Sequence, residues 1–348
     1  MSPGYRDFLA LPERDRADIF QLTADEHGTL GSYVEKDFWV CLVLDVLFNG
    51  LPEDHPALSF KGGTSLSKVF GLIRRFSEDI DITASRVELG FGGARDPADA
   101  NLQLSKNKRK ALVRELRAAV SGYARDRLRP ILEEEIGQFA DNIRIDTDPG
   151  DSDDATLLVH YPELMSEGRP GYVEARIKIE LGARAAQEPN TEGTITPYVS
   201  SKELEMDLIV EGICTVTAEH TFWEKVFILH GWQCRFRDQQ VTVADGDLAS
   251  RHYYDVAMIS QARTSEAMIA DGDLLDQVRE HNKLMFPQGW KKYDEACPGG
   301  FLIVPAEQLL EDIRRDYEKM VSMVLGDAPP FNDVIDQIGE LEAKLNAL

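Results

Sequence analysis

Two aspartates separated by one residue, Asp79 and Asp81 in the segment SEDIDI, are the first candidates for chemistry in this sequence. Side chains alternate between the two faces of a β-strand, so on a strand both carboxylates project from the same face. Two like charges that close together need a cation or a proton to neutralise them. Mg²⁺ prefers oxygen ligands and is commonly held by one or two carboxylates and substrate phosphates, and a pair of ions can assist both the attacking and the leaving oxygen. The spacing therefore predicts a site for two Mg²⁺ ions.

A double glycine, Gly62 and Gly63, precedes this pair and is followed by Thr64 and Ser65. Glycines let the backbone approach a phosphate closely, and the free N–H groups at the start of a helix attract an anion. The two hydroxyls add further donors. The segment lacks the GxxxxGK[ST] pattern of a P-loop. We therefore interpret it as a different kind of turn that binds the phosphates of a nucleotide.

Glu180, in the segment RIKIEL, is a candidate third metal ligand. It lies on the polar side of an alternating segment whose apolar positions would anchor it in the sheet. The alternative is a strand residue that faces solvent and pairs with Lys178.

The hydrophobic pattern predicts the elements that carry these residues. Residues 1–55 are expected to be helical, with Ser32 capping the strongest segment. A short strand at 58–60 leads through the glycine turn to a helix whose apolar positions recur as far as Ile73, and the alternation of 76–83 indicates a strand. Residues 141–160 predict a hairpin, 171–184 a strand, and the chain from 217 onward helices. We therefore expect an α+β protein with a mixed sheet in residues 1–216 and a helical region in 217–348.

The chain is acidic, with a formal net charge of −23, which repels nucleic acid on average. Residues 105–129 reverse the sign, with nine Lys and Arg against two acidic residues. On a helix, one narrow stripe would contain Lys106, Lys110, Arg114 and Arg117. This stripe is either a solvated basic face or a surface that tracks an RNA backbone.

Composition excludes some classes of protein. No run approaches the roughly 18 apolar residues of a membrane span, and the N-terminal segment is charged where a signal peptide needs an apolar core. The four cysteines form no CxxC pair and have no histidine cluster with zinc-ligand spacing. We expect a cytoplasmic protein that does not bind a membrane.

Six segments together resemble one family. They are VEKDFWV at 34–40, FKGGTSLSK at 60–68, RFSEDIDI at 75–82, RIKIEL at 176–181, HTFWEKVFILH at 220–230 and RHYYDVAMI at 251–259. In this order they are similar to the AbiEii/AbiGii toxin family, whose members have the nucleotidyltransferase core of the polymerase-β superfamily. The resemblance implies a toxin of a toxin–antitoxin or phage-defence pair that transfers a nucleotide from an NTP to RNA, with tRNA 3′ ends as targets of some members.

The resemblance also implies roles for individual residues. Gly62, Gly63 and Thr64 match the phosphate-binding turn, and Asp79 and Asp81 match the metal ligands. Ser77 matches a motif serine beside the nucleotide, which kinase-type antitoxins phosphorylate in some members. Lys225 matches a lysine of the active site, and Asp255 matches a catalytic aspartate.

Simple chemistry is compatible with these roles and leaves alternatives. Lys225 can bind a triphosphate as a compact charge, or it can be a helix-surface lysine paired with Glu224. Asp255 can orient Lys225 or an RNA hydroxyl. Arg74 and Arg75 can hold RNA phosphates, or they can be solvated cations at the end of a helix, where the helix dipole favours positive charge.

The sequence as a whole leads to the hypothesis of a Mg²⁺-dependent nucleotidyltransferase that transfers a nucleotide from an NTP to RNA. Its expected acceptor is a tRNA 3′ end, and it is expected to have a cognate antitoxin. One alternative is an enzyme of the same fold that attaches a nucleotide or a phosphate to protein. The other is a binding protein that captures an NTP or a partner without turnover.

Overall fold

The computed structural model describes residues 2–166, 174–199, 204–242 and 248–348 and divides into two compact units. One unit, called the sheet unit here, comprises Met1–Phe70 and Phe76–Val216. The other, the helical unit, comprises Gly71–Arg75 and Thr217–Leu348. The helical unit thus begins at the residue where the hydrophobic pattern turns helical, but it also takes in the short segment 71–75.

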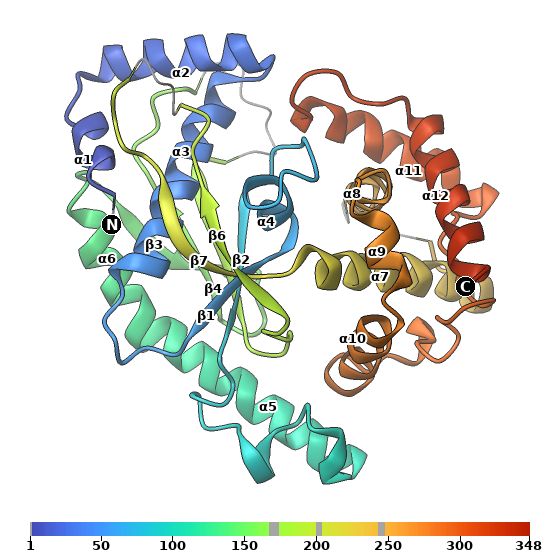
Figure 1. Cartoon of the computed structure of the whole chain (residues 1–348). Helices are drawn as coiled ribbons and strands as arrows, with labels where there is room; N and C mark the ends of the chain where they lie inside the picture. The colour runs from blue at the N-terminus through green and yellow to red at the C-terminus, as the bar shows by residue number, and fades with distance from the viewer. Residues whose placement is uncertain (1, 167–173, 200–203, 243–247) are drawn as a thin grey trace. The chain divides into compact units, whose positions relative to one another are not determined.

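The sheet unit is built on one mixed seven-stranded sheet (Figure 1). Its strands are β1 (Leu58–Lys61), β2 (Asp79–Ala84), β3 (Arg144–Thr147), β4 (Thr156–His160), β5 (Arg176–Gly182), β6 (Asn190–Ile195) and β7 (Val210–Val216). They lie in the order β3-β4-β5-β2-β1-β7-β6. The β1/β7 and β2/β5 pairs are parallel and the other pairs antiparallel. The predicted α+β class, mixed sheet and 141–160 hairpin are confirmed.

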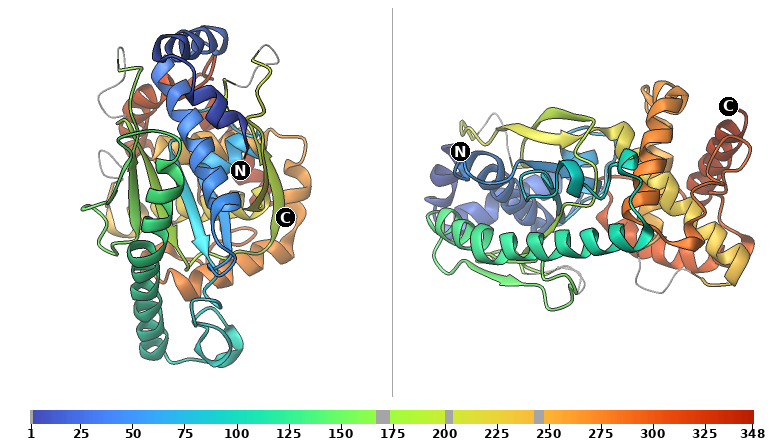
Figure 2. Two further views of the ribbon diagram at one scale, coloured as in Figure 1. Left: turned by 90° about the vertical axis from the view of Figure 1, so that its left-hand side faces the viewer. Right: turned by 90° about the horizontal axis from the view of Figure 1, so that it is seen from below.

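Helices surround this sheet. They are α1 (Gly4–Leu9), α2 (Glu13–His27), α3 (Gly31–Asp45), α4 (Gly62–Lys68), α5 (Lys106–Tyr123) and α6 (Arg129–Gly137), with π-helical turns η1 (Val46–Gly50) and η4 (Ala124–Leu128). Because η4 joins α5 to α6 without a break, the three run as one long helix (Figure 2). Helix α3 packs against β5 and β7, and α6 contacts β3 and η1.

Two local expectations were wrong. Ser32 does not cap α3: Leu30 is the N-cap residue, no side chain caps this end, and the buried Ser32 hydroxyl has no hydrogen-bond partner. The helix after the glycine turn was expected to continue through Ile73, but α4 ends at Lys68. Gly71 has a φ of +61°, a conformation that a right-handed helix does not contain.

Helix α3 is buried along its whole length although it contains three consecutive charged residues, Glu35, Lys36 and Asp37. Each contacts a distant segment. The Glu35 carboxylate accepts hydrogen bonds from the Leu164 and Met165 amides at 2.8 and 2.9 Å. Buried charges are tolerated only when they are paired or hydrogen-bonded, so these contacts fix segments far apart in the sequence around α3.

The other two charges of α3 support the elements that carry the glycine turn and the aspartates. Lys36 Nζ lies 2.5 Å from the carboxylate of Glu78, the residue before Asp79. Asp37 lies 2.7 Å from Nζ of Lys68, the last residue of α4. Helix α3 therefore anchors both the start of β2 and the end of α4 inside the sheet unit.

Glu35 is expected to make stability depend on pH. Burial raises its pKa from an ordinary 4.5 to about 7, although the two amide hydrogen bonds act in the opposite sense. Because this pKa is raised, the protonated Glu35 side chain stabilises the fold fully below about pH 4.5. This stabilisation, roughly 3 kcal/mol, is lost as the pH rises to about 7. Glu35→Gln should flatten this part of the profile in urea unfolding at pH 5, 6, 7 and 8. Parallel profiles for the two proteins would contradict the assignment.

The helical unit contains α7 (Ala218–Gln239), α8 (Ser250–Ser260), α9 (Ser265–Ala270), α10 (Gly272–Met285), α11 (Glu307–Met320) and α12 (Phe331–Asn346). The helices predicted from 217 onward are thus confirmed. Segment 71–75 joins this unit through an isolated bridge between Arg75 and Val324 and through a 2.7 Å hydrogen bond from the Leu325 amide to the Arg74 carbonyl. No helix in the described part of the chain is long and apolar enough to cross a bilayer.

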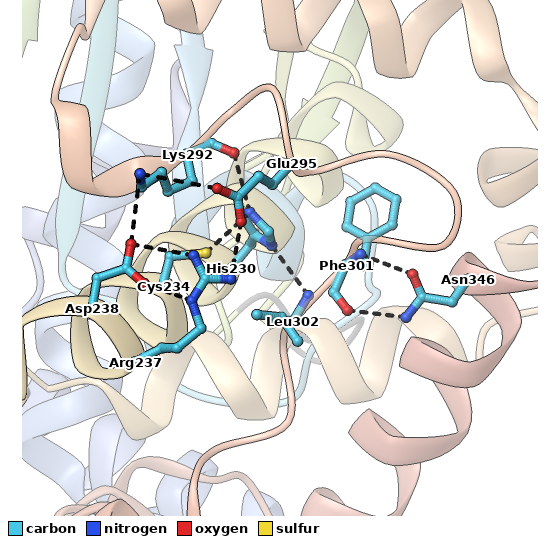
Figure 3. A network of polar contacts seen from close by, with 9 residues as sticks. All are labelled: His230, Cys234, Arg237, Asp238, Lys292, Glu295, Phe301, Leu302 and Asn346. Carbon is cyan, nitrogen blue, oxygen red and sulfur yellow. Dashed lines mark hydrogen bonds and ion pairs between the residues drawn. The ribbon is translucent and has the colours of Figure 1, made fainter.

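A polar network in this unit fixes the loop that follows α10 (Figure 3). His230 on α7 accepts a 3.1 Å hydrogen bond at Nδ1 from the Leu302 amide, and its Nε2 lies 3.3 Å from the Lys292 carbonyl. Because Nδ1 accepts from an amide and Nε2 faces a carbonyl, these contacts fit a ring with its proton on Nε2, and burial lowers the pKa of His230. Both nitrogens hold backbone, which makes this histidine a structural residue.

Candidate active site

The double glycine forms the corner between β1 and α4. Gly62 has a φ of +83°, which L side chains rarely adopt. A Cβ placed there would lie 2.0 Å from Asp81 Oδ2. The carboxylate of Asp81 therefore packs directly against the Cα of Gly62, and both the backbone conformation and the close approach require glycine.

The hydroxyls that follow the glycines face inward, which differs from the expectation that they would face a ligand. Thr64 and Ser65 are buried. The Thr64 hydroxyl donates to the Asp79 carbonyl at 2.5 Å and lies 2.9 Å from Ser77 Oγ, and the Ser65 hydroxyl donates to the Gly62 carbonyl at 2.9 Å. These contacts hold the turn and the start of β2 together, so both hydroxyls are engaged within the protein.

Asp79 and Asp81 both belong to β2, where Ile80 and Ile82 between and after them are buried. The alternation of the strand puts the two carboxylates on the face opposite the isoleucines. Asp81 lies opposite Lys61 of β1 in the antiparallel register. The structure therefore has the geometry that the sequence predicted: two carboxylates on one face of a strand, one of them against the glycine turn.

The neighbouring strand β5 adds charges to this face. In the parallel register Asp79 pairs with Lys178, and Asp81 pairs with Glu180. Lys178 Nζ lies 2.6 Å from Glu180 Oε1 and 3.9 Å from Asp148 Oδ2. Burial by itself would lower the pKa of Lys178, but the contact with Glu180 and the charges of Glu180, Asp79 and Asp148 raise it.

Glu180 therefore has the partner named as its alternative, Lys178. Across residues 2–166, 174–199, 204–242 and 248–348, no three His, Cys, Asp or Glu side chains lie close enough to hold a metal ion. A set of three carboxylates is not assembled in this conformation. Sequence reasoning treated Lys178 only as a partner of Glu180 and missed its place beside Asp79, because the sequence carries no signal for which strands pair.

Asp79 and Asp81 fit a magnesium ion that is shared with substrate phosphates. Both supply oxygen ligands, and the absence of a Cβ at position 62 lets the Asp81 carboxylate lie directly against the glycine turn. Two carboxylates are a common protein contribution to a Mg²⁺ site when a nucleotide supplies the other ligands.

A second charged cluster lies in the helical unit and joins α7, α8 and segment 71–75. The Asp255 carboxylate accepts two hydrogen bonds from Arg75, from Nε and from a terminal nitrogen, both at 2.8 Å. Its Oδ2 also lies 2.9 Å from Lys225 Nζ. All three side chains are buried. Burial by itself would raise the pKa of Asp255, but the charges of Arg75 and Lys225 hold it well below its usual range.

This cluster shows which partner Lys225 has. Lys225 pairs with Asp255 instead of Glu224, a contact that is compatible with the suggestion that Asp255 orients Lys225. The prediction that Arg75 contacts RNA was wrong for this conformation, because its guanidinium is buried and engaged in two hydrogen bonds with Asp255. Arg74 is exposed, and its contact with RNA stays a prediction.

Comparison with known proteins assigns the family. Residues 45–338 match the family model described as "Nucleotidyl transferase AbiEii toxin, Type IV TA system". The chain belongs to this AbiEii family. It is also similar in structure to MenT4, a nucleotidyltransferase toxin from Mycobacterium tuberculosis H37Rv, with 14% identity and a TM-score of 0.47 over 94% of this chain and 99% of that one. No curated protein matches the sequence.

The AbiEii match includes both charged clusters, from the glycine turn to Asp255, and begins after Glu35, Lys36 and Asp37. This chain is therefore a toxin-family nucleotidyltransferase, and the family assignment implies a cognate antitoxin. The nucleotide, the acceptor and the metal are treated below as proposals.

The basic stripe of this AbiEii chain lies on α5. Lys106, Lys110 and Arg114 are exposed, whereas Arg117 is half-buried and lies 3.3 Å from Asp153. Three of the four predicted cations are thus accessible to a polyanion.

Gly62→Ala is expected to damage the site more than the fold. An alanine at this position would have a strained φ, which costs roughly 1–3 kcal/mol. Its Cβ would also have to displace the Asp81 carboxylate, which lies 2.0 Å away. A displacement near 1 Å of a reacting group can cost about a hundredfold in rate, and this is the loss we expect in a transfer assay. Gly122→Ala on α5, where a Cβ meets nothing within 4 Å, is the matched control and should retain full activity. Equal activity of the two variants would contradict the close approach.

Proposed function

We propose that this AbiEii-family toxin is a Mg²⁺-dependent enzyme that transfers a nucleotide from an NTP to RNA, with a tRNA 3′ end as its acceptor. One observation carries the proposal. Asp79 and Asp81 share a strand face, and Asp81 packs against a glycine turn whose φ of +83° excludes side chains. That arrangement offers carboxylate oxygens to a cation and bare backbone to a triphosphate at the same corner.

Each residue of the site has its own role in this proposal. Asp79 and Asp81 would hold an ion that is shared with the phosphates, and the Gly62–Gly63 backbone would allow the triphosphate to approach closely. The Thr64 hydroxyl fixes the strand start by its 2.5 Å bond to the Asp79 carbonyl. When bound, Mg²⁺ lowers the pKa of an attacking hydroxyl and neutralises charge on the departing pyrophosphate. Catalysis of this kind depends on positioning and charge stabilisation.

The remaining predicted residues keep roles that the resemblance implies. Lys225, held at 2.9 Å by Asp255, is the proposed triphosphate contact of the helical unit. Ser77, beside the Thr64 hydroxyl, is the proposed regulatory position, since a phosphate there would add negative charge two residues from Asp79.

The test is nucleotide transfer with purified protein. Each of the four α-labelled NTPs is incubated separately with Mg²⁺ and either total RNA or purified tRNA. We expect label in RNA with at least one NTP, lost with EDTA and with Asp79→Ala. Label in lysate proteins but in no RNA would favour the protein-modifying alternative. Equal cell toxicity of Asp79→Ala and the wild type would favour a binding protein.

The stripe of Lys106, Lys110 and Arg114 supports an RNA acceptor, because exposed cations gather there in a chain of net charge −23. Reversing all three to Glu should raise the KM for RNA about tenfold or more and weaken its salt dependence, with NTP binding unchanged. The matched control reverses Arg14, Arg144 and Arg315, whose side chains are 89%, 67% and 63% exposed. An equal rise in KM in both triple variants would indicate a net-charge effect and contradict a local RNA surface.

A further inference from the structure

Lys178 lies on the face of the sheet that carries Asp79 and Asp81. It is the residue of β5 directly beside Asp79 in the parallel register, and its ammonium lies 2.6 Å from Glu180, the residue beside Asp81. Asp148 Oδ2 lies 3.9 Å from the same ammonium. Two carboxylates therefore pair with Lys178, and the neighbouring position on β2 carries a third, that of Asp79.

This position has a consequence for the number of metal ions. The sequence predicts two ions on Asp79 and Asp81, with Glu180 as a candidate third ligand. A second ion held by Glu180 would be shared with a neighbouring carboxylate such as that of Asp79. In the structure the ammonium of Lys178 contacts Glu180, and Lys178 is the direct strand neighbour of Asp79, so its charge competes with an ion that Glu180 and Asp79 would share. Like charges so close need a cation, and a lysine can supply it as a compact charge.

We propose that Lys178 is a built-in substitute for the second divalent ion, so that this chain binds one Mg²⁺ with each nucleotide instead of two. The inference rests on the proposed function, because it assigns the first ion to Asp79, Asp81 and the NTP phosphates. Lys178 is a positioning residue in this scheme: it keeps Glu180 and Asp79 from binding a second ion and orients them.

The exposure of the pair makes the proposal testable by substitution. The side chains of Lys178 and Glu180 are 36% and 43% exposed, so Lys178→Met and Lys178→Gln remove the charge without leaving a cavity in the core. Removal leaves Asp79, Glu180 and Asp148 without the ammonium, and a second divalent ion is then expected to bind weakly in its place.

The experiment counts Mn²⁺ ions by electron paramagnetic resonance in the presence of a non-hydrolysable NTP analogue. We expect one ion in the wild type and in Lys178→Arg, two in Lys178→Met and Lys178→Gln, and one again in the double variant Lys178→Met/Glu180→Gln. Transfer by Lys178→Met should fall at least tenfold at low Mg²⁺ and recover at high Mg²⁺, and the double variant should not recover. A purely structural role for Lys178 would produce no such rescue.

The outcomes separate this inference from the proposed function. Two ions in the wild type, or one ion in both neutral variants of Lys178, would overturn the inference and leave the Asp79–Asp81 site intact. Absence of any Mn²⁺ binding to the wild type with the analogue would overturn the metal site of the proposed function itself, and the inference with it.

Discussion

Asp81→Asn is expected to reduce nucleotide transfer about a thousandfold or more while the protein stays folded. The amide keeps the shape of the side chain but removes the negative charge that holds the cation, and metal stabilisation of a phosphoryl transfer contributes several kcal/mol, each 1.36 kcal/mol being a factor of ten. Stability should not fall, because the substitution removes one of several like charges on the face that contains Asp79 and Glu180.

The measurement is the single-turnover rate at saturating NTP, with thermal unfolding recorded on the same samples. Asp126→Asn is the control, because that aspartate is exposed and pairs with the adjacent Arg125 away from the site. A rate for Asp81→Asn within tenfold of the wild type would show that the carboxylate does not bind the catalytic cation.

Asp255→Ala should have the largest effect on stability. The substitution removes the counter-charge that Arg75 and Lys225 share inside the helical unit, where all three side chains are buried. Removing one partner of a buried ion pair typically costs about 3–5 kcal/mol, since a desolvated charge loses its compensation. Urea unfolding of the variant and the wild type measures this loss.

Two further variants distinguish charge from packing. Asp255→Asn keeps oxygen and nitrogen atoms in place and should lose less than Asp255→Ala, whereas Arg75→Met/Lys225→Met/Asp255→Leu replaces the whole cluster by apolar atoms and should recover most of the stability. No recovery in the triple variant would contradict an electrostatic origin.

The pH dependence of this cluster has a definite sign. The pKa of Asp255 is held well below its usual range in the folded protein. Its contribution to stability is therefore present above the ordinary pKa of an aspartate, near 4, and is lost only as the pH falls further through the depressed value. The cluster is fully stabilising at the neutral pH of a transfer assay.

Local patterns in the sequence sufficed for the strands and for the face of the aspartates. The alternation of β5 predicted its burial pattern, with Ile177, Ile179 and Leu181 buried. The same period of two put Asp79 and Asp81 on one side of β2, and the paired glycines marked the corner that meets Asp81. These features depend on neighbours within a few residues, so their signals are written in consecutive positions.

Only the tertiary structure decided which distant charges meet. Arg75 contacts Asp255 across 180 positions, Lys36 contacts Glu78, and Lys178 lies beside Asp79 because β5 and β2 pair in one register. The sequence determined an acidic, strand-borne site next to a glycine turn. It left open whether each lysine and arginine faces a ligand or a carboxylate, because a buried charge takes its partner from whichever segment the packed core brings within about 3 Å.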